Sequence, residues 1–152
     1  MMLLTSCINA SKKLTLSLCL MVAATAMMAP HASAGEADIV KVKAKKTRTG
    51  LWQFSVSVRH DDAGWDHYAN NWEVLSPDGE RIAERVLGHP HVDEQPFTRS
   101  LSGVKIPENL THVIIRARDS VHGYGGQTVR VDLATRKAVI ITKPELPDVA
   151  KP

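Results

Sequence analysis

The chain has 152 residues, and its 19 lysines and arginines exceed its 16 aspartates and glutamates by three charges. The two cysteines, all five methionines and two of the lysines lie within the first 34 residues, which we interpret as a leader. The remaining 118 residues carry 17 basic and 16 acidic side chains and no sulfur. This composition excludes disulfides, thiolate nucleophiles, iron–sulfur clusters and soft Cu(I) sites. It also lacks the clustered positive charge of a nucleic-acid binder.

The first 34 residues have the pattern of a secretory signal peptide. Two lysines precede an apolar run over residues 14–29, and the small residues "ASA" follow, ending at Ala34. The apolar run is shorter than the ~20 residues that a membrane span requires. Leu18 precedes Cys19, where a lipoprotein signal would have a small residue, so we expect no lipid anchor there. We predict cleavage after Ala34 and a periplasmic or secreted product without a membrane span.

Beyond the leader, apolar and polar residues alternate in short runs bounded by turn residues. This period of two is typical of half-buried strands. The lysines in the first run indicate a solvent-facing edge strand that resists pairing with another molecule. In the fifth run the alternation changes phase at Ser102-Gly103, which predicts a bulge. The predicted strands cover residues 38–46, 51–60, 68–76, 80–88, 97–106, 111–119 and 127–133.

Seven short strands over about 100 residues predict an all-β fold, an antiparallel two-sheet sandwich of the immunoglobulin-like type. We expect this domain to cover residues 35–135. A C-terminal extension over residues 136–152 begins with an apolar run that can add one strand, and it ends in a Pro-rich tail.

Reversal of chain direction at each turn places alternate connections at opposite ends of a sandwich. One end collects plain tight turns, and the other collects the longer loops 61–67, 89–96 and 120–126. Four of the six histidines beyond the leader lie in these three loops, His60 adjoins one of them, and only His112 maps to the opposite end. Since immunoglobulin-like domains bind with loops at one end, we expect a single binding rim here.

Imidazole and carboxylate groups together suit zinc, copper(II) or nickel(II). Pro90 favours extended geometry for His89, so that His89 and His91 can converge on an ion with a third imidazole. The alternative is that these side chains hydrogen-bond one another and backbone amides, and so stiffen the loops. The predicted metal ligands are His67, His89, His91, His122, Asp93 and Glu94, and the predicted ion is zinc or copper(II).

Two further features of the same loops receive other interpretations. His60 continues the inward face of its strand, so we expect a half-buried imidazole bonded to Asp62 or Asp119 rather than a ligand. Ser120 and His122 beside Asp119 have the composition of a nucleophilic triad. No nucleophile-elbow pattern surrounds the serine, so an enzyme is the less favoured interpretation.

Three segments carry a resemblance to other proteins. "WDHYANNWEVLSPDG", "LGHPHVDEQPFTRSL" and "IRARDSVHGYGG" resemble an uncharacterised family of exported bacterial proteins, over most of residues 38–133. The resemblance implies a periplasmic β-sandwich that is immunoglobulin-like or fibronectin type III-like. It implies no activity, cofactor or catalytic residue.

The sequence thus leads to three functional hypotheses. The first is a small exported β-sandwich whose loop end binds a divalent transition metal. The second is an interaction module in which Trp65, Tyr68 and Tyr124 dock on another envelope protein, a glycan or a small ligand, and the histidines are structural. The third and weakest is a hydrolase.

Overall fold

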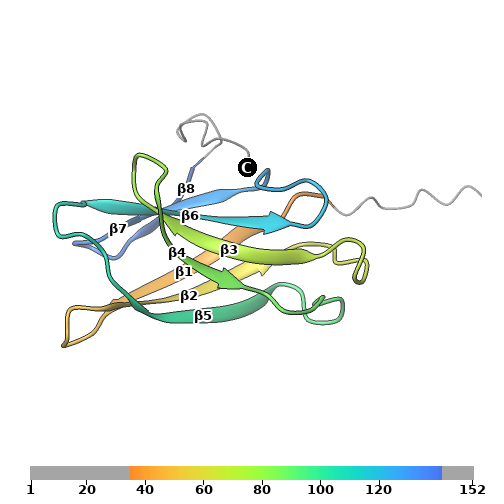
Figure 1. The fold of residues 1–152 in the computed structure, drawn as a ribbon, viewed down its shortest axis with the longest axis horizontal. Helices are drawn as coiled ribbons and strands as arrows, with labels where there is room; N and C mark the ends of the chain where they lie inside the picture. Colours follow the sequence, from red (N-terminus) through yellow and green to blue (C-terminus); the bar gives the residue numbers. More distant parts are fainter. Residues whose placement is uncertain (1–34, 142–152) are drawn as a thin grey trace, which may run out of the picture. The chain divides into compact units, whose positions relative to one another are not determined.

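The computed structural model of the protein describes residues 35–141, which form two antiparallel β-sheets around one core (Figure 1). One sheet has the strand order β1-β2-β5, and the other has the order β4-β3-β6-β7-β8. The predicted all-β, antiparallel two-sheet sandwich is therefore confirmed. The predicted leader and the Pro-rich tail lie outside the described residues. The strands are β1 Asp38–Lys46, β2 Trp52–Arg59, β3 Ala69–Leu75, β4 Arg81–Val86, β5 Phe97–Val104, β6 His112–Asp119, β7 Thr128–Asp132 and β8 Ala138–Ile141.

All seven predicted strands are present, with ends that differ by a few residues. The eighth strand, β8, pairs antiparallel with β7 in the segment where the sequence predicted an added strand. The predicted bulge is also present, because Trp52 and Phe54 on β2 face Val104 and Leu101 on β5, which leaves one extra residue on β5. Gly103 takes up this bulge with a φ of 78°, a conformation that residues with a Cβ rarely adopt.

The core lies between the two sheets because one face of each strand is apolar. On β2, Phe54, Val56 and Val58 are fully buried, and they meet Trp72 and Ile115 from the larger sheet. Each fully buried side chain of this kind contributes about 1.5–3 kcal/mol to folding. The sandwich therefore gains its stability without disulfides, as the sequence required.

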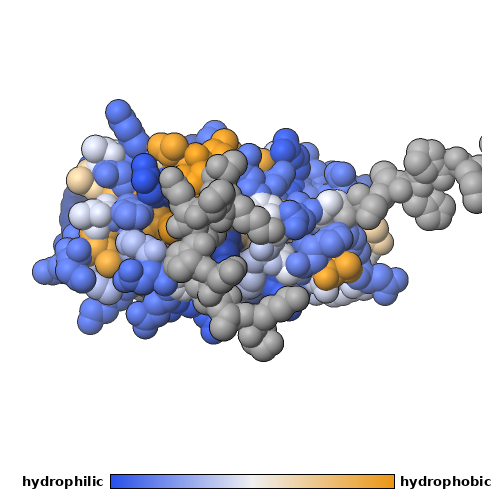
Figure 2. Space-filling view, turned by 90° about the horizontal axis from the view of Figure 1, so that it is seen from above, coloured by the Kyte–Doolittle hydropathy of each residue, from blue (hydrophilic) through white to orange (hydrophobic). Residues whose placement is uncertain are grey.

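The face seen in Figure 2 is mostly hydrophilic outside the grey atoms, and its apolar residues gather in patches. Strand β1 lies at the edge of the smaller sheet with Lys41, Lys43 and Lys45 exposed, as expected for an edge strand. Among residues 35–141, no helix is long and apolar enough to cross a membrane.

The three longer connections, β2–β3, β4–β5 and β6–β7, lie at the same end of the sandwich (Figure 1). At this end the start of β1, in the smaller sheet, is hydrogen-bonded to the β6–β7 connection of the larger sheet. Gln127 N donates to Asp38 Oδ1 at 2.7 Å, and Ile39 N donates to Gln127 O at 2.9 Å. A Cβ on Gly126 would overlap the carbonyl group of Ala37, so only glycine allows this close approach.

Candidate metal centre

The gathering of the three histidine-bearing loops at one end is confirmed by contacts between their side chains. The rings of His67 and His122 lie 4.8 Å apart between centroids, although 55 positions separate them in the chain. The β4–β5 loop joins the same end, because His91 N donates to Asp62 Oδ2 at 2.6 Å. The alternation argument thus predicted correctly which segments meet.

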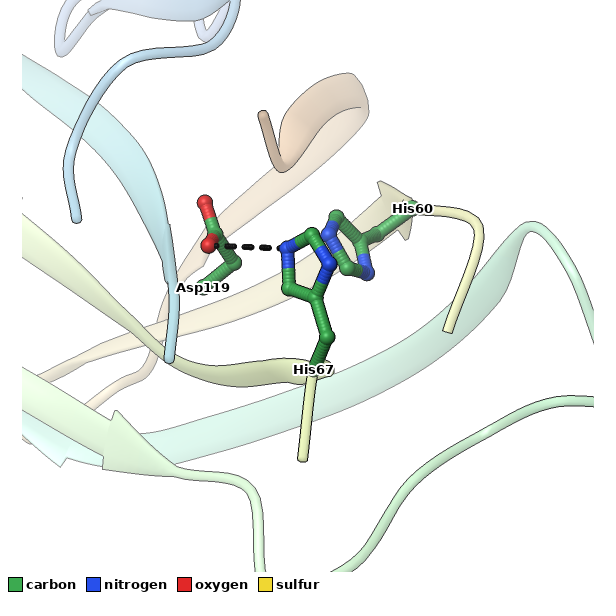
Figure 3. Close-up of side chains that lie close together, drawn as sticks. All are labelled: His60, His67 and Asp119. Carbon is green, nitrogen blue, oxygen red and sulfur yellow. Dashed lines mark hydrogen bonds and ion pairs between the residues drawn. The ribbon is translucent and has the colours of Figure 1, made fainter. Parts of the chain in front are cut away.

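A compact group forms where the β2–β3 loop meets the end of β6. One ligand-capable atom from each of His60, His67 and Asp119 lies within 4.8 Å of the other two (Figure 3). The His60 and His67 rings meet edge to face, with centroids 4.8 Å apart. His122 adjoins them, with Nδ1 3.2 Å from Asp119 Oδ1. We call these four residues the His60 cluster.

Asp119, the last residue of β6, is fully buried, and only one of its oxygens is satisfied. Oδ1 accepts the backbone N–H groups of Val121 and His122, at 2.9 and 2.6 Å, and also lies 3.1 Å from His67 Nε2. Burial raises the pKa of Asp119, but these backbone donors and the nearby His122 and His60 outweigh it, so its pKa is lowered. Asp119 is therefore a carboxylate, and its Oδ2 is buried without a partner among the described residues.

His60 presents the same asymmetry as Asp119. Its Nδ1 lies 2.5 Å from Asp62 Oδ1, while its Nε2 is buried and has no partner among the described residues. Of the two partners predicted for His60, Asp62 or Asp119, the structure has Asp62. His60 is buried rather than half-buried, with 2% of the residue exposed, and its Nε2 has no contact with bulk solvent.

These unpartnered atoms fit a metal ion. A buried polar atom without a hydrogen bond costs about 1–3 kcal/mol, so two such atoms in one small group call for a partner such as a bound ion or an ordered water. Ligand atoms around a zinc ion with bonds of about 2.0–2.1 Å lie about 3.4 Å from one another. One ligand-capable atom from each of His60, His67 and Asp119 lies within 4.8 Å of the other two, so these three residues need shifts of about 1 Å to reach that geometry.

The charges of the site also match a divalent cation. Asp62 and Asp119 are both buried carboxylates, and within residues 35–141 neither forms an ion pair with a lysine or arginine. Within this range, the side chains in contact with the two carboxylates are histidines. A divalent ion would balance both charges and would accept the imidazole nitrogens as ligands.

The second group, the Glu94 cluster, consists of His89, His91 and Glu94, which also offer ligand atoms within 4.8 Å of one another. Here Arg99 occupies the position of a cation, with Nη2 2.7 Å from Glu94 Oε1 and 3.1 Å from His91 Nδ1. Arg99 and then His91 hold the pKa of Glu94 below its ordinary range. His91 is buried, and its ring packs on Phe97 with centroids 3.9 Å apart. This arrangement is typical of an ion-pair network that fixes a loop.

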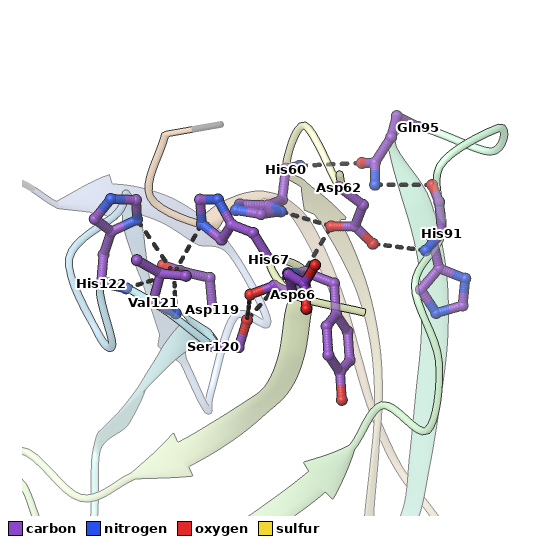
Figure 4. A network of polar contacts seen from close by, with 12 residues as sticks. His60, Asp62, Asp66, His67, His91, Gln95, Asp119, Ser120, Val121 and His122 are labelled. Carbon is purple, nitrogen blue, oxygen red and sulfur yellow. Dashed lines mark hydrogen bonds and ion pairs between the residues drawn. The ribbon is translucent and has the colours of Figure 1, made fainter. Parts of the chain in front are cut away.

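The predicted ligands therefore divide into two groups. His67 and His122 belong to the His60 cluster, whereas His89, His91 and Glu94 form the Glu94 cluster, and exposed Asp93 belongs to neither. Asp62 connects the two groups, because its carboxylate contacts both His60 Nδ1 and His91 N (Figure 4). Sequence reasoning identified His60 and Asp119 only as a possible structural pair. The sequence does contain one signal for a role of His60 as a ligand, which is its imidazole on the inward face of a strand.

The aromatic residues predicted to bind a partner also separate. Trp65 is 69% exposed on the β2–β3 loop and contacts Tyr68 edge to face at 5.8 Å. Tyr124 instead folds onto the outer face of the larger sheet, where its hydroxyl donates to Glu73 Oε2 at 3.1 Å and its ring lies 4.0 Å from the Arg116 guanidinium carbon. Burial raises the pKa of Tyr124, as expected for a half-buried phenol.

The residues of the hydrolase hypothesis do not form a triad in this structure. The Ser120 hydroxyl accepts from Tyr68 N at 3.2 Å and donates to Asp66 O at 3.4 Å. Its hydrogen bonds within the described part of the chain are thus to backbone atoms, and His122 contacts Asp119 without it. A serine held in this way stabilises the conformation of its loop.

A comparison with curated proteins finds one informative similarity. Over 97 residues the chain is 42% identical to a putative lipoprotein of Halomicrobium mukohataei, which covers 64% of this chain and 47% of that protein. The chain thus spans about half the length of this relative. No family model and no solved structure matches the chain. The immunoglobulin-like and fibronectin type III-like assignments therefore stay predictions.

Proposed function

We propose that this protein is an exported, envelope-associated β-sandwich that binds one divalent transition metal ion, zinc or copper(II), in the His60 cluster. The buried and unpartnered atoms His60 Nε2 and Asp119 Oδ2, within one group of potential ligands, carry this proposal. The signal-peptide pattern and the similarity to a putative lipoprotein support an envelope location.

The composition of the site favours transition metals over calcium. Calcium takes six to eight oxygen ligands, whereas the His60 cluster offers three imidazoles and one carboxylate. Four donors of this kind suit tetrahedral zinc or tetragonal copper(II). His122 is the most exposed member of the cluster, so it is the ligand best placed to close over an ion that enters from solvent.

The proposal is tested by metal analysis and calorimetry on protein purified without a histidine tag. We expect one zinc or copper(II) ion per chain, and loss of this binding in the variants His60→Ala and Asp119→Asn. His112→Ala is the matched control, because His112 starts β6 at the opposite end of the sandwich. Equal binding by His60→Ala and His112→Ala would reject the His60 cluster as the site.

A second function is favoured by one specific observation. Each of the three loops exposes a large apolar side chain, and Trp65, Val92 and Val121 are between 54% and 69% exposed. We propose as the alternative that this end docks on an envelope protein or a glycan. A partner recovered by cross-linking in metal-free conditions, and lost in Trp65→Ala but not in His112→Ala, would support this alternative.

A further inference from the structure

We propose that Asp62 is a positioning residue that holds His60 as the tautomer with its proton on Nδ1, which leaves the Nε2 lone pair free for the ion. The role toward the ion rests on the proposed function. The tautomer itself is a property of the metal-free chain and can be measured without any ion.

The contacts of Asp62 show why its carboxylate acts only as an acceptor here. The backbone N–H of Ala69 donates to Oδ1 at 3.0 Å, and the backbone N–H of His91 donates to Oδ2 at 2.6 Å. Backbone amides cannot accept in return, so both oxygens must be acceptors toward them. An ionised carboxylate has no proton to donate, so the contact of 2.5 Å between Oδ1 and His60 Nδ1 places the proton on Nδ1.

The proton on Nδ1 determines the state of the other nitrogen. A neutral imidazole carries one N–H, so Nε2 keeps its lone pair when Nδ1 is protonated. A proton on Nε2 would instead be a buried donor without an acceptor, because His60 Nε2 has no partner among the described residues. The environment therefore favours the tautomer that a metal ligand needs.

Asp62 also fixes the direction of the His60 ring. Its side chain is completely buried, and it joins the end of β2, the start of β3 and the β4–β5 loop through His60, Ala69 and His91 (Figure 4). His67 lies in the β2–β3 loop between Asp62 and Ala69, so the same carboxylate closes the loop that carries a second ligand. Carboxylates that orient ligating histidines in this way typically account for 10–100-fold of metal affinity.

The pair formed by Glu94 and His91 provides a comparison within the same protein. Glu94 also lies 2.6 Å from a histidine Nδ1, but its side chain is half exposed and binds Arg99 as well. Asp62 contacts no lysine or arginine in the described part of the chain, so its charge acts on His60. Glu94→Gln is therefore the matched control for Asp62→Asn.

The test is long-range proton–nitrogen NMR on metal-free protein with neutral histidines, followed by titration with zinc. We expect His60 with Nδ1 protonated and Nε2 bare, and a change of the Nε2 signal when zinc binds. Asp62→Asn should lower zinc affinity 10–100-fold, while Glu94→Gln leaves the affinity unchanged.

A protonated Nε2 on His60 in the metal-free wild type would overturn the inference, whether or not zinc binds. Unchanged zinc affinity in a folded Asp62→Asn variant would overturn it as well. If Asp62→Asn fails to fold, the NMR measurement of the His60 tautomer in the wild type is sufficient to accept or reject the inference. A bare Nε2 without zinc binding would reject the proposed metal centre and leave the tautomer assignment in place.

Discussion

Zinc should stabilise the metal-free protein by an amount that follows from the two unpartnered atoms. His60 Nε2 and Asp119 Oδ2 each cost about 1–3 kcal/mol while they are buried without a partner, so ligation can recover about 2–6 kcal/mol. Zinc at 100 times its dissociation constant adds about 2.7 kcal/mol by mass action, which lies within that range. The unfolding entropy of residues 35–141 is about 0.22 kcal/mol/K, so the expected rise in Tm is about 12 °C.

The assay is thermal unfolding, followed by circular dichroism, of chelator-treated protein with and without zinc. His60→Ala should lose the rise in Tm, and His112→Ala should keep it, because the His112 side chain hydrogen-bonds Thr111 at the opposite end of the sandwich. The reasoning would be refuted if zinc at saturating concentration left the wild-type Tm unchanged. It would equally be refuted if both variants gained the same rise.

Three other variants test separate parts of the structure. Trp72→Ala should lower the free energy of unfolding by about 3–5 kcal/mol in urea titrations, because Trp72 is completely buried, and a loss below about 1 kcal/mol would contradict the placement of the core. Trp65→Ala should change that free energy by less than about 0.5 kcal/mol, since most of the side chain is in solvent, and a larger loss would mean that Trp65 covers the loops. The lowered pKa of Glu94 stabilises the folded state above the ordinary glutamate pKa of about 4.3, and this contribution disappears as pH falls through the lowered value. Carbon NMR titration should therefore find the Glu94 pKa below the ordinary glutamate value in the wild type and higher in Arg99→Gln, and an equal pKa in both proteins would show that Arg99 is not the cause.

The sequence predicted the strands and the common end of the three loops well because both follow from local patterns. Alternating residues determine which strand face is buried, and the reversal of direction at each turn determines the end at which a loop lies. Gly103 is an example. The alternation of apolar and polar residues changes phase at Ser102-Gly103, and this change predicted the bulge that the structure has. His112 is a second example, because the count of turns placed it alone at the opposite end.

The division of the predicted rim into two groups could not be predicted from the same patterns. Alternation gives the end of the sandwich where a side chain lies, but it gives no distance between side chains on different loops. The Glu94 cluster depends on Arg99, which reaches it from β5, and no spacing in the sequence links that arginine to His91. Tyr124 was expected on the rim, but Glu73 and Arg116 attract it to the outer face of the sheet.

The role that we propose for His60 could not be predicted from the sequence, for a related reason. An imidazole on an inward strand face is more often a satisfied core residue than a ligand, and its pairing with Asp62 agreed with that expectation. What changes the interpretation is the missing partner of Nε2, which depends on the packing of the neighbouring loops. Such an absence becomes visible only in three dimensions.

The junction between the start of β1 and the β6–β7 connection has a consequence for how the proposed metal centre would assemble. Asp38 and Ala37 come from the beginning of the domain. Asp38 accepts a hydrogen bond from Gln127 N, and the Ala37 carbonyl lies against Gly126, the last residue of the loop that carries His122. The first strand therefore holds the C-terminal end of the connection that carries His122, while Asp119 holds its N-terminal part through Val121 N and His122 N. Ion uptake at the proposed site is expected to weaken if the first strand is detached from this connection.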